Sequence, residues 1–236
     1  MLINACLVSA LLCAQPLTPA DPQPDAQPFP HLRVDRKARV VEFDAVVPID
    51  ARTPDAKGRH PLIYLELIAC TPDTREHESL VVTSAKPSHI HAALLLIGLE
   101  PGKPGAWTTR NREAVLTPPT GDEVRVEFVT LDNEGKEHVS PAASWVRHAQ
   151  TNERLPDRPF LFAGSRIVQR PAGEIYDADM SGTLIGLATF GTETLALPTV
   201  FSPEAAVDEP VWIADPENTP PRGTSVRVRL TPANKQ

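Results

Sequence analysis

Residues 64–105 of this chain read YLELIACTPDTREHESLVVTSAKPSHIHAALLLIGLEPGKPG, and this stretch decides the fold. The run Leu62–Ala69, which overlaps its start, is rich in large apolar residues and predicts a strand that is covered on both faces. Turn-forming residues occupy Thr71–Glu76, and Ser79–Thr83 is again β-prone. A hairpin is the simplest prediction for this half of the stretch.

The second half predicts a helix. Ser88 is a candidate N-cap, and every residue of Ile90–Ile97 except His91 is apolar. Because such a helix has no polar face of ordinary width, we expect Ile90–Ile97 to be a buried core helix. Gly98 can adopt the left-handed conformation that ends a helix.

Alternating apolar and polar residues predict strands on both sides of this stretch. The sequence Asp132-Asn133-Glu134-Gly135 predicts a tight turn after one of them, and Ala142–Gln150 predicts a short helix. The β-prone segments outside the central stretch are Arg39–Val47, Glu123–Leu131, Lys136–Val139, Phe160–Val168, Thr183–Phe190 and Thr224–Leu230. The expected fold class is therefore α+β and β-rich, with antiparallel or mixed sheets of about eight strands packed around one buried core helix.

Four strings of the sequence resemble the YdjY-domain family, a family of uncharacterised bacterial proteins. They are ACTPDTREHESLVV, AKPSHIHAALLLIGLEPGKPG, FLFAGSRIV and SGTLIGLATFG, and the resemblance covers roughly Val34–Pro232. In the family pattern an acidic residue commonly occupies the position of His89. The resemblance implies a single domain, and it implies no activity, substrate or catalytic residue.

The N-terminus reads as a secretory signal peptide, because Met1–Ala20 combines a short apolar run with small residues at its end. Cleavage is expected after Ala20, with Ala14 as the alternative. Lipoprotein anchoring at Cys13 is not expected, because Leu12 stands where a small residue normally precedes a lipidated cysteine. We therefore expect an exported protein, periplasmic or extracellular, with no transmembrane segment after the leader is removed.

The remaining chain suits one domain, since about 200 residues can bury a core without disulfide support. We expect a proline-rich disordered linker at residues 21–33, a single domain at 34–232 and a tail at 233–236. The formal net charge of −7, with basic residues spread through the sequence, excludes a nucleic-acid partner. Cys70 is the only cysteine after the leader, which excludes an intrachain disulfide, an iron–sulfur cluster and a four-cysteine zinc site.

The candidate catalytic residues are Cys70, His77, Glu78 and His91. In the predicted hairpin Cys70 and His77 lie opposite each other, about 5 Å apart at their Cβ atoms. His91 near the helix N-terminus should be neutral, because the positive end of the helix dipole disfavours the imidazolium. The candidate metal ligands are His77, Glu78 and His91, for a zinc-type ion.

Each of these residues also has a structural interpretation. Cysteine is commonly buried, and one histidine on an apolar helix is commonly hydrogen-bonded in a core. Glu76 and Glu78 beside His77 can form a solvated rim of the sheet. No Cys-x-x-Cys or His-x-x-x-His spacing is present. No cofactor is therefore expected.

Two functions follow from the sequence. The favoured one is an exported non-catalytic binding or assembly module of unknown ligand, whose partner is a protein or another component of the cell envelope. The alternative is a metal-binding or Cys/His-dependent enzyme that uses the cluster His77, Glu78, His91 and Cys70.

Overall fold

The computed structural model describes residues 29–110, 113–171, 173–205 and 207–233. The predicted signal peptide, linker residues 21–28 and tail residues 234–236 lie outside this part of the chain. Within it, no helix is long and apolar enough to cross a membrane.

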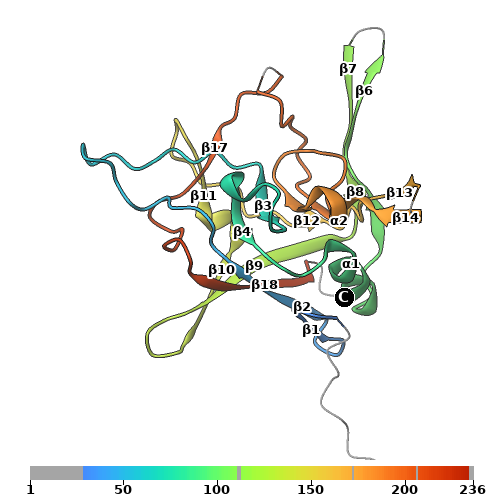
Figure 1. Ribbon diagram of the computed structural model, residues 1–236, viewed down its shortest axis with the longest axis horizontal. Helices are drawn as coiled ribbons and strands as arrows, with labels where there is room; N and C mark the ends of the chain where they lie inside the picture. The colour runs from blue at the N-terminus through green and yellow to red at the C-terminus, as the bar shows by residue number, and fades with distance from the viewer. Residues whose placement is uncertain (1–28, 111–112, 172, 206, 234–236) are drawn as a thin grey trace, which may run out of the picture.

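Eight strands of the described chain close into a mixed barrel (Figure 1). In order around the ring they are β2 (Val40–Val46), β18 (Ser225–Pro232), β9 (Glu123–Leu131), β12 (Phe160–Leu161), β16 (Leu195–Ala196), β15 (Thr183–Gly186), β3 (Leu67–Cys70) and β4 (Ser79–Val82). The pairs β15–β16 and β3–β4 are parallel, and the other pairs are antiparallel. The ring closes where Val46 of β2 meets Val82 of β4, and the Thr83 hydroxyl donates to the Asp44 carbonyl across the same seam (2.6 Å).

The remaining elements surround the barrel. Strand β1 (Leu32–Asp35) extends the sheet beside β2, and β10 (Glu137–Pro141) extends it beside β9. In the described part of the chain, four two-stranded pairs lie outside the barrel: β5 (Pro101–Lys103) with β8 (Thr120–Gly121), β6 (Ala106–Arg110) with β7 (Glu113–Thr117), β11 (Val146–His148) with β17 (Trp212–Ala214), and β13 (Ile167–Arg170) with β14 (Gly173–Tyr176). The helical segments are α1 (Pro87–Leu96), α2 (Asp177–Ser181), and the 3₁₀ turns η1 (Glu76–Glu78) and η2 (Ala142–Trp145).

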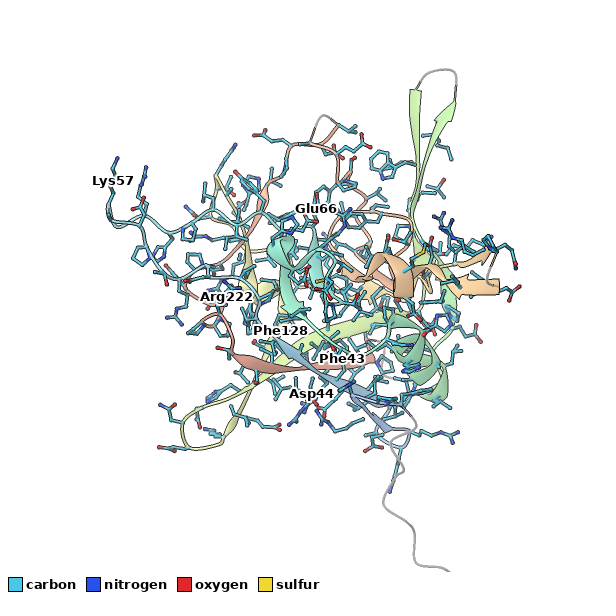
Figure 2. All side chains as sticks on the ribbon, in the orientation of Figure 1. Phe43, Asp44, Lys57, Glu66, Phe128 and Arg222 are labelled. Carbon is cyan, nitrogen blue, oxygen red and sulfur yellow. The ribbon has the colours of Figure 1, made fainter. Side chains whose placement is uncertain are left out.

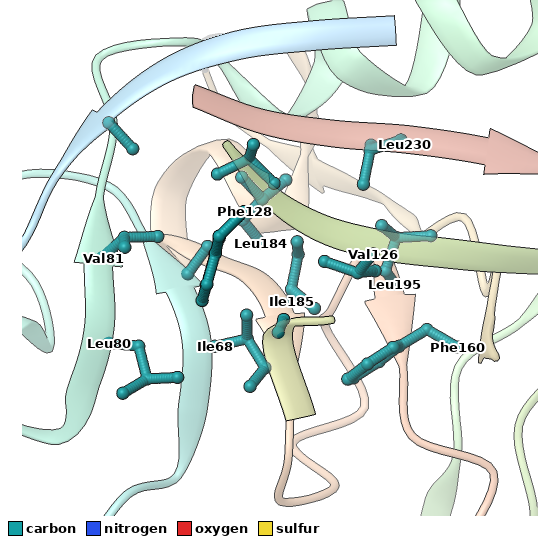
Figure 3. Packing of buried hydrophobic residues seen from close by; sticks show 14 of the residues in the cluster. Ile68, Leu80, Val81, Val126, Phe128, Phe160, Leu184, Ile185, Leu195 and Leu230 are labelled. Carbon is teal, nitrogen blue, oxygen red and sulfur yellow. The ribbon is translucent and has the colours of Figure 1, made fainter. Parts of the chain in front are cut away.

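The barrel interior is the hydrophobic core, which Figure 3 shows from close by. The alternation along β2, β9 and β18 buries alternate side chains, as the sequence predicted, and Val129 of β9 is buried in addition to its neighbour Phe128. Figure 2 shows Phe43 and Phe128 on the interior side and Asp44 on the outer side. Phe128 also packs on Trp145, with ring centroids 4.3 Å apart. Truncating a buried phenylalanine of this kind typically costs about 3–5 kcal/mol, so each ring contributes substantially to the stability of the core.

The predicted hairpin between the first two strands of the central stretch is wrong. Strands β3 and β4 are parallel, with Leu67 beside Ser79 and Cys70 beside Val82. The connection through η1 runs back along β3 before β4 begins, and the Glu66 N–H donates to the Glu78 carbonyl there (3.0 Å). The segment 71–78 therefore acts as a crossover connection, which a parallel pair requires.

The predicted core helix packs against the barrel, and the sheet does not wrap around it. Helix α1 begins at Pro87, one residue before the predicted N-cap, and it contacts β1, β2 and α2. Leu95 is 47% exposed, whereas Leu94 is fully buried, so one side of this apolar helix faces solvent. The predicted end is confirmed, because Gly98 has a φ of 79° and the Leu99 N–H donates to the Leu94 carbonyl (3.1 Å).

Two predictions in the second half have opposite outcomes. The turn at residues 132–135 is confirmed, since it joins β9 to β10 and the Asp132 carboxylate accepts the Glu134 and Lys136 N–H groups (2.9 Å each). The helix at Ala142–Gln150 is wrong beyond its first turn. The chain leaves η2 at Trp145 and continues as β11, whose pairing with β17 satisfies its backbone groups.

Candidate functional site

The structure separates the four residues that the sequence singled out. Cys70 is buried in β3, where its neighbours across the ladder are Val82 and Thr183, so it does not face His77. Burial raises the pKa of the Cys70 thiol, which disfavours the reactive thiolate. His77 lies on η1 with 80% of its side chain exposed, and its Nε2 atom is 3.7 Å from the Glu78 carboxylate.

His91 has a different environment on α1. Its Nδ1 atom lies 3.0 Å from the Tyr176 hydroxyl, and its ring packs edge-on against Phe162 (4.9 Å between centroids). Burial lowers the pKa of His91, so the imidazole is neutral at neutral pH, as predicted, although the cause is burial. His89, two residues earlier, stacks on Phe29 (5.0 Å).

The predicted metal centre is not assembled. Across the described residues, no group of three or more histidine, cysteine, aspartate or glutamate side chains is placed to hold a metal ion. His77 is on the η1 turn at the surface, whereas His91 on α1 is hydrogen-bonded to Tyr176, the residue just before α2.

The loop 189–194 between β15 and β16 is held in place by hydrogen bonds from the turn at Gly164 and Ser165. Three groups of polar side chains lie in or beside this loop. The Gly164 N–H donates to the Thr194 carbonyl (2.9 Å), and the Ser165 N–H donates to the Glu193 carbonyl (3.1 Å). The Ser165 hydroxyl donates to the Thr192 carbonyl (2.5 Å). Since Gly164 and Ser165 both have positive φ angles, of 81° and 50°, the chain makes a sharp turn against this loop.

A chain of polar side chains lies on one side of the loop. The Tyr176 hydroxyl lies 3.0 Å from His91 Nδ1 and 3.2 Å from the Thr194 hydroxyl. Burial raises the pKa of Tyr176, so the phenol stays protonated and can donate to the neutral imidazole. This chain joins α1, β14 and the loop, and it accounts for His91 as a hydrogen-bonded partner of the core.

One residue of the loop, Glu193, has its carboxyl group buried against the loop backbone. Glu193 is fully buried, and its Oε2 atom accepts the Thr192 N–H (2.9 Å). Burial raises the pKa of this carboxyl group, although hydrogen bonds from backbone N–H groups, first those of Glu193 itself and Thr192, act in the opposite direction. Desolvation is therefore the largest influence on this carboxyl group.

A carboxyl pair bridged by an arginine lies on the other side of the loop. Arg75 Nη1 donates to Glu66 (2.9 Å) and to Glu78 (2.6 Å). The Arg75 guanidinium also lies 4.5 Å above the ring of Phe190. Burial, reinforced by the charge of Glu78, raises the pKa of Glu66 to about 7, while Arg75 acts to lower it. A pKa near 7 places the protonation change of Glu66 close to neutral pH.

A cleft of about 280 Å³ opens between the loop and the base of the β6–β7 hairpin, which projects from the barrel in Figure 1. Its lining residues are Pro104, Gly105, Ala106, Trp107, Arg166, Phe190 and Gly191. The Trp107 indole N–H donates to the Thr189 carbonyl (3.2 Å), which fixes the hairpin base to the loop. Gly105 is required for this approach, because a Cβ atom there would lie 2.6 Å from Thr189 Cγ2.

Arg166 is the charged side chain in this cleft. Its Nε atom donates to Asp177 (2.6 Å), and Asp177 is almost fully buried. The Arg166 side chain is 60% exposed, and its two Nη atoms have no hydrogen-bond partner among the described residues. A guanidinium fixed through Nε keeps both terminal amino groups available to a ligand.

A larger groove of about 500 Å³ lies where β2, β4, β9 and β18 meet. It is lined by Val46, Val129 and Leu131 among other apolar residues. Its charged side chains are already paired, because Asp44 binds Arg33 and Arg227 binds Glu137 (2.8 Å). A binding site needs a few polar groups that converge on the ligand, so the smaller cleft is the better candidate despite its size.

Sequence reasoning found Glu78 and His91 near this loop and missed the residues of the cleft. Trp107, Arg166 and Phe190 come from three segments that no local pattern connects. Two of the strings that carry the family resemblance, FLFAGSRIV and SGTLIGLATFG, contain Arg166 and Phe190, and that was the available signal.

Comparison with known proteins gives one result. No curated protein and no solved structure matches this chain. The model of the YdjY domain matches residues 32–231, which cover most of the chain and include every residue of the cleft. The chain belongs to the YdjY-domain family.

Proposed function

We propose that this chain is an exported, non-catalytic binding module and that it binds a small ligand in the cleft between Trp107, Arg166 and Phe190. The leader-like N-terminus supports export to the periplasm or the outside of the cell. The ligand or partner belongs to the cell envelope or its surroundings, and a nucleic acid is disfavoured by the net charge of −7.

The observation that carries this proposal is the composition of the cleft. Two aromatic side chains form its walls, and one guanidinium supplies terminal donors that no described residue uses. Ligand sites are typically clefts with mostly apolar walls and a few polar groups that fix orientation. The volume of about 280 Å³ is just below the about 300–1,000 Å³ that is usual for such sites, which suits a small ligand.

The test uses the three tryptophans of the chain as local reporters. A ¹⁵N-labelled protein that starts at residue 21 is titrated with a set of small aromatic and aliphatic compounds, and the indole N–H signals are followed by NMR. We expect some compounds to move the signal of Trp107 in a saturable way and to leave those of Trp145 and Trp212 in place. If every compound leaves Trp107 unchanged, or moves all three signals alike, the cleft does not bind ligands.

A second candidate function is acid–base catalysis at Glu66 and Glu78. It is favoured by the pKa of Glu66, about 7, since a general acid or base works best when its pKa is near the working pH. The test is turnover of chromogenic esters and glycosides. Turnover that Glu66→Gln abolishes and His77→Ala retains would support catalysis at this pair, and turnover that survives Glu66→Gln would exclude it.

A further inference from the structure

We infer that the ligand of this cleft carries an oxyanion, a carboxylate or a phosphate, next to an apolar ring, and that Arg166 binds the oxyanion. This inference rests on the proposed function and specifies the ligand class of the same site. It follows from the way Arg166 is fixed, from the charges around the cleft, and from the aromatic walls.

Arg166 is fixed through its Nε atom, and its two terminal amino groups can therefore donate hydrogen bonds to a ligand. Asp177 accepts only the Nε hydrogen (2.6 Å), and the Asp177 N–H donates in return to the Arg166 carbonyl (2.9 Å). The carboxylate is almost fully buried beneath the guanidinium, so it orients the arginine without reaching the cleft. Two parallel N–H groups of an arginine match the spacing of two oxygens in a carboxylate or phosphate.

The charged groups around the cleft admit an anion. A second guanidinium, that of Arg75, lies over the ring of Phe190, 4.5 Å from its centroid. The carboxylates of Glu66 and Glu78 are both bonded to Arg75. Glu193 of the loop is fully buried and does not line the cleft. Arg166 is therefore the charged side chain that an incoming ligand meets in the lining of the cleft.

The walls select the part of the ligand beside the oxyanion. Trp107 and Phe190 are both partly exposed and line the cleft together with Pro104 and Ala106. An aromatic or other flat apolar group can stack on such side chains, because offset and edge-on arrangements of rings are favourable. The cleft therefore has room for one ring and its oxyanion.

The experiment compares three probes that share a phenyl ring. Benzoate and phenyl phosphate carry an oxyanion, and benzyl alcohol is uncharged. Each is titrated into the ¹⁵N-labelled wild-type protein that starts at residue 21, and the dissociation constant is obtained from the Trp107 indole signal. We expect at least one anion to bind about 10-fold more tightly than the alcohol, which corresponds to one charge-assisted hydrogen-bond interaction. The stronger anion identifies the source of the oxyanion.

Variants then assign the effect to Arg166. Arg166→Gln should remove the preference for the anion, and Arg166→Lys should retain part of it, since lysine keeps the charge but loses the two parallel donors. Arg158→Gln is the matched control, because Arg158 is an exposed arginine outside the cleft, and it should bind like the wild type. Each variant is accepted only if its NMR spectrum shows the folded chain.

The outcomes separate this inference from the proposed function. Equal affinity for benzyl alcohol and for both anions would overturn the oxyanion inference and leave a cleft that binds apolar rings. A preference for anions that persists in Arg166→Gln would overturn the role of Arg166. If none of the three probes moves the Trp107 signal, the oxyanion inference is overturned. The proposed function then depends on the broader compound set described above.

Discussion

The substitution Glu66→Gln should stabilise the fold at high pH and leave it unchanged at low pH. The pKa of Glu66 is raised to about 7 by burial first and by the charge of Glu78 second. A raised carboxyl pKa means that the folded state holds the proton more tightly than the unfolded state does. The stability that this proton supplies is fully present below the unfolded value near 4.5 and is lost as the pH rises through about 7. Glutamine has a similar shape and no ionisation to suppress.

The expected magnitude follows from the two pKa values. A change from 4.5 to about 7 corresponds to about 3 kcal/mol, at about 1.4 kcal/mol per pKa unit. The Glu66 side chain is 20% exposed and Arg75 is bonded to it (2.9 Å), so solvent and the guanidinium screen part of the cost. We therefore expect Glu66→Gln to be about 1–2 kcal/mol more stable than the wild type at pH 8, after this discount for screening.

The assay is urea unfolding followed by circular dichroism at several pH values between about 4.5 and 8, where both midpoint and slope are fitted. Glu134→Gln is the control, because Glu134 is exposed in the turn between β9 and β10 and its substitution should shift the curve equally at every pH. A stability difference between Glu66→Gln and the wild type that does not grow with pH would refute this account of the carboxyl pair.

Three further predictions concern packing. Leu94→Ala should lower the free energy of unfolding by about 2–5 kcal/mol, and Leu95→Ala by about 1 kcal/mol or less, because only Leu94 is buried; urea midpoints compare the two, and equal losses would place α1 differently. Cys70 should react with a thiol reagent only after unfolding, since it is fully buried, and rapid labelling of the folded protein would contradict this. Tyr176→Phe should cost about 1–3 kcal/mol, because it leaves His91 Nδ1 without its partner, and an unchanged melting temperature would show that this bond contributes little.

The strands with one buried face and one solvent-exposed face could be predicted from the sequence, because alternating apolar and polar residues within each strand reveal them. The alternation in Val40–Val46, Glu123–Leu131 and Ser225–Pro232 is sufficient to predict three strands and their buried faces, and the structure pairs them as neighbours. The turn at Asp132–Gly135 needed only its own side chains. In each case the information lies within about ten residues of the element it determines.

The barrel closure could not be predicted because it depends on distant pairings. Strand β3 is apolar throughout, which is consistent with a hairpin or with a parallel pair, and its own residues do not indicate that it pairs with β15 on one edge and with β4 on the other. The helix α1 was overestimated for a related reason. Its composition is apolar on every side, but the barrel covers only one side, so Leu95 remains exposed.

The candidate site had the weakest signal in the sequence. Cys70, His77 and Glu78 are close along the chain, but the parallel crossover places them in different environments. Cys70 lies in the β3 strand, the His77 side chain is exposed, and Glu78 is paired with Arg75. The cleft is lined by Trp107 of the β6–β7 hairpin, by Arg166 of the segment after β12, and by Phe190 of the loop after β15. Only the folded barrel brings these three segments together.

The most direct test of the binding site is the location of a bound probe. Intermolecular nuclear Overhauser effects are measured between benzoate, phenyl phosphate or the tightest binder of the broader set and the isotope-labelled protein. We expect contacts from the phenyl ring of the bound probe to the protons of Trp107 and Phe190. Contacts instead to Val46 and Leu131 would show that the ligand binds in the larger groove where β2, β4, β9 and β18 meet, and would contradict binding in the cleft.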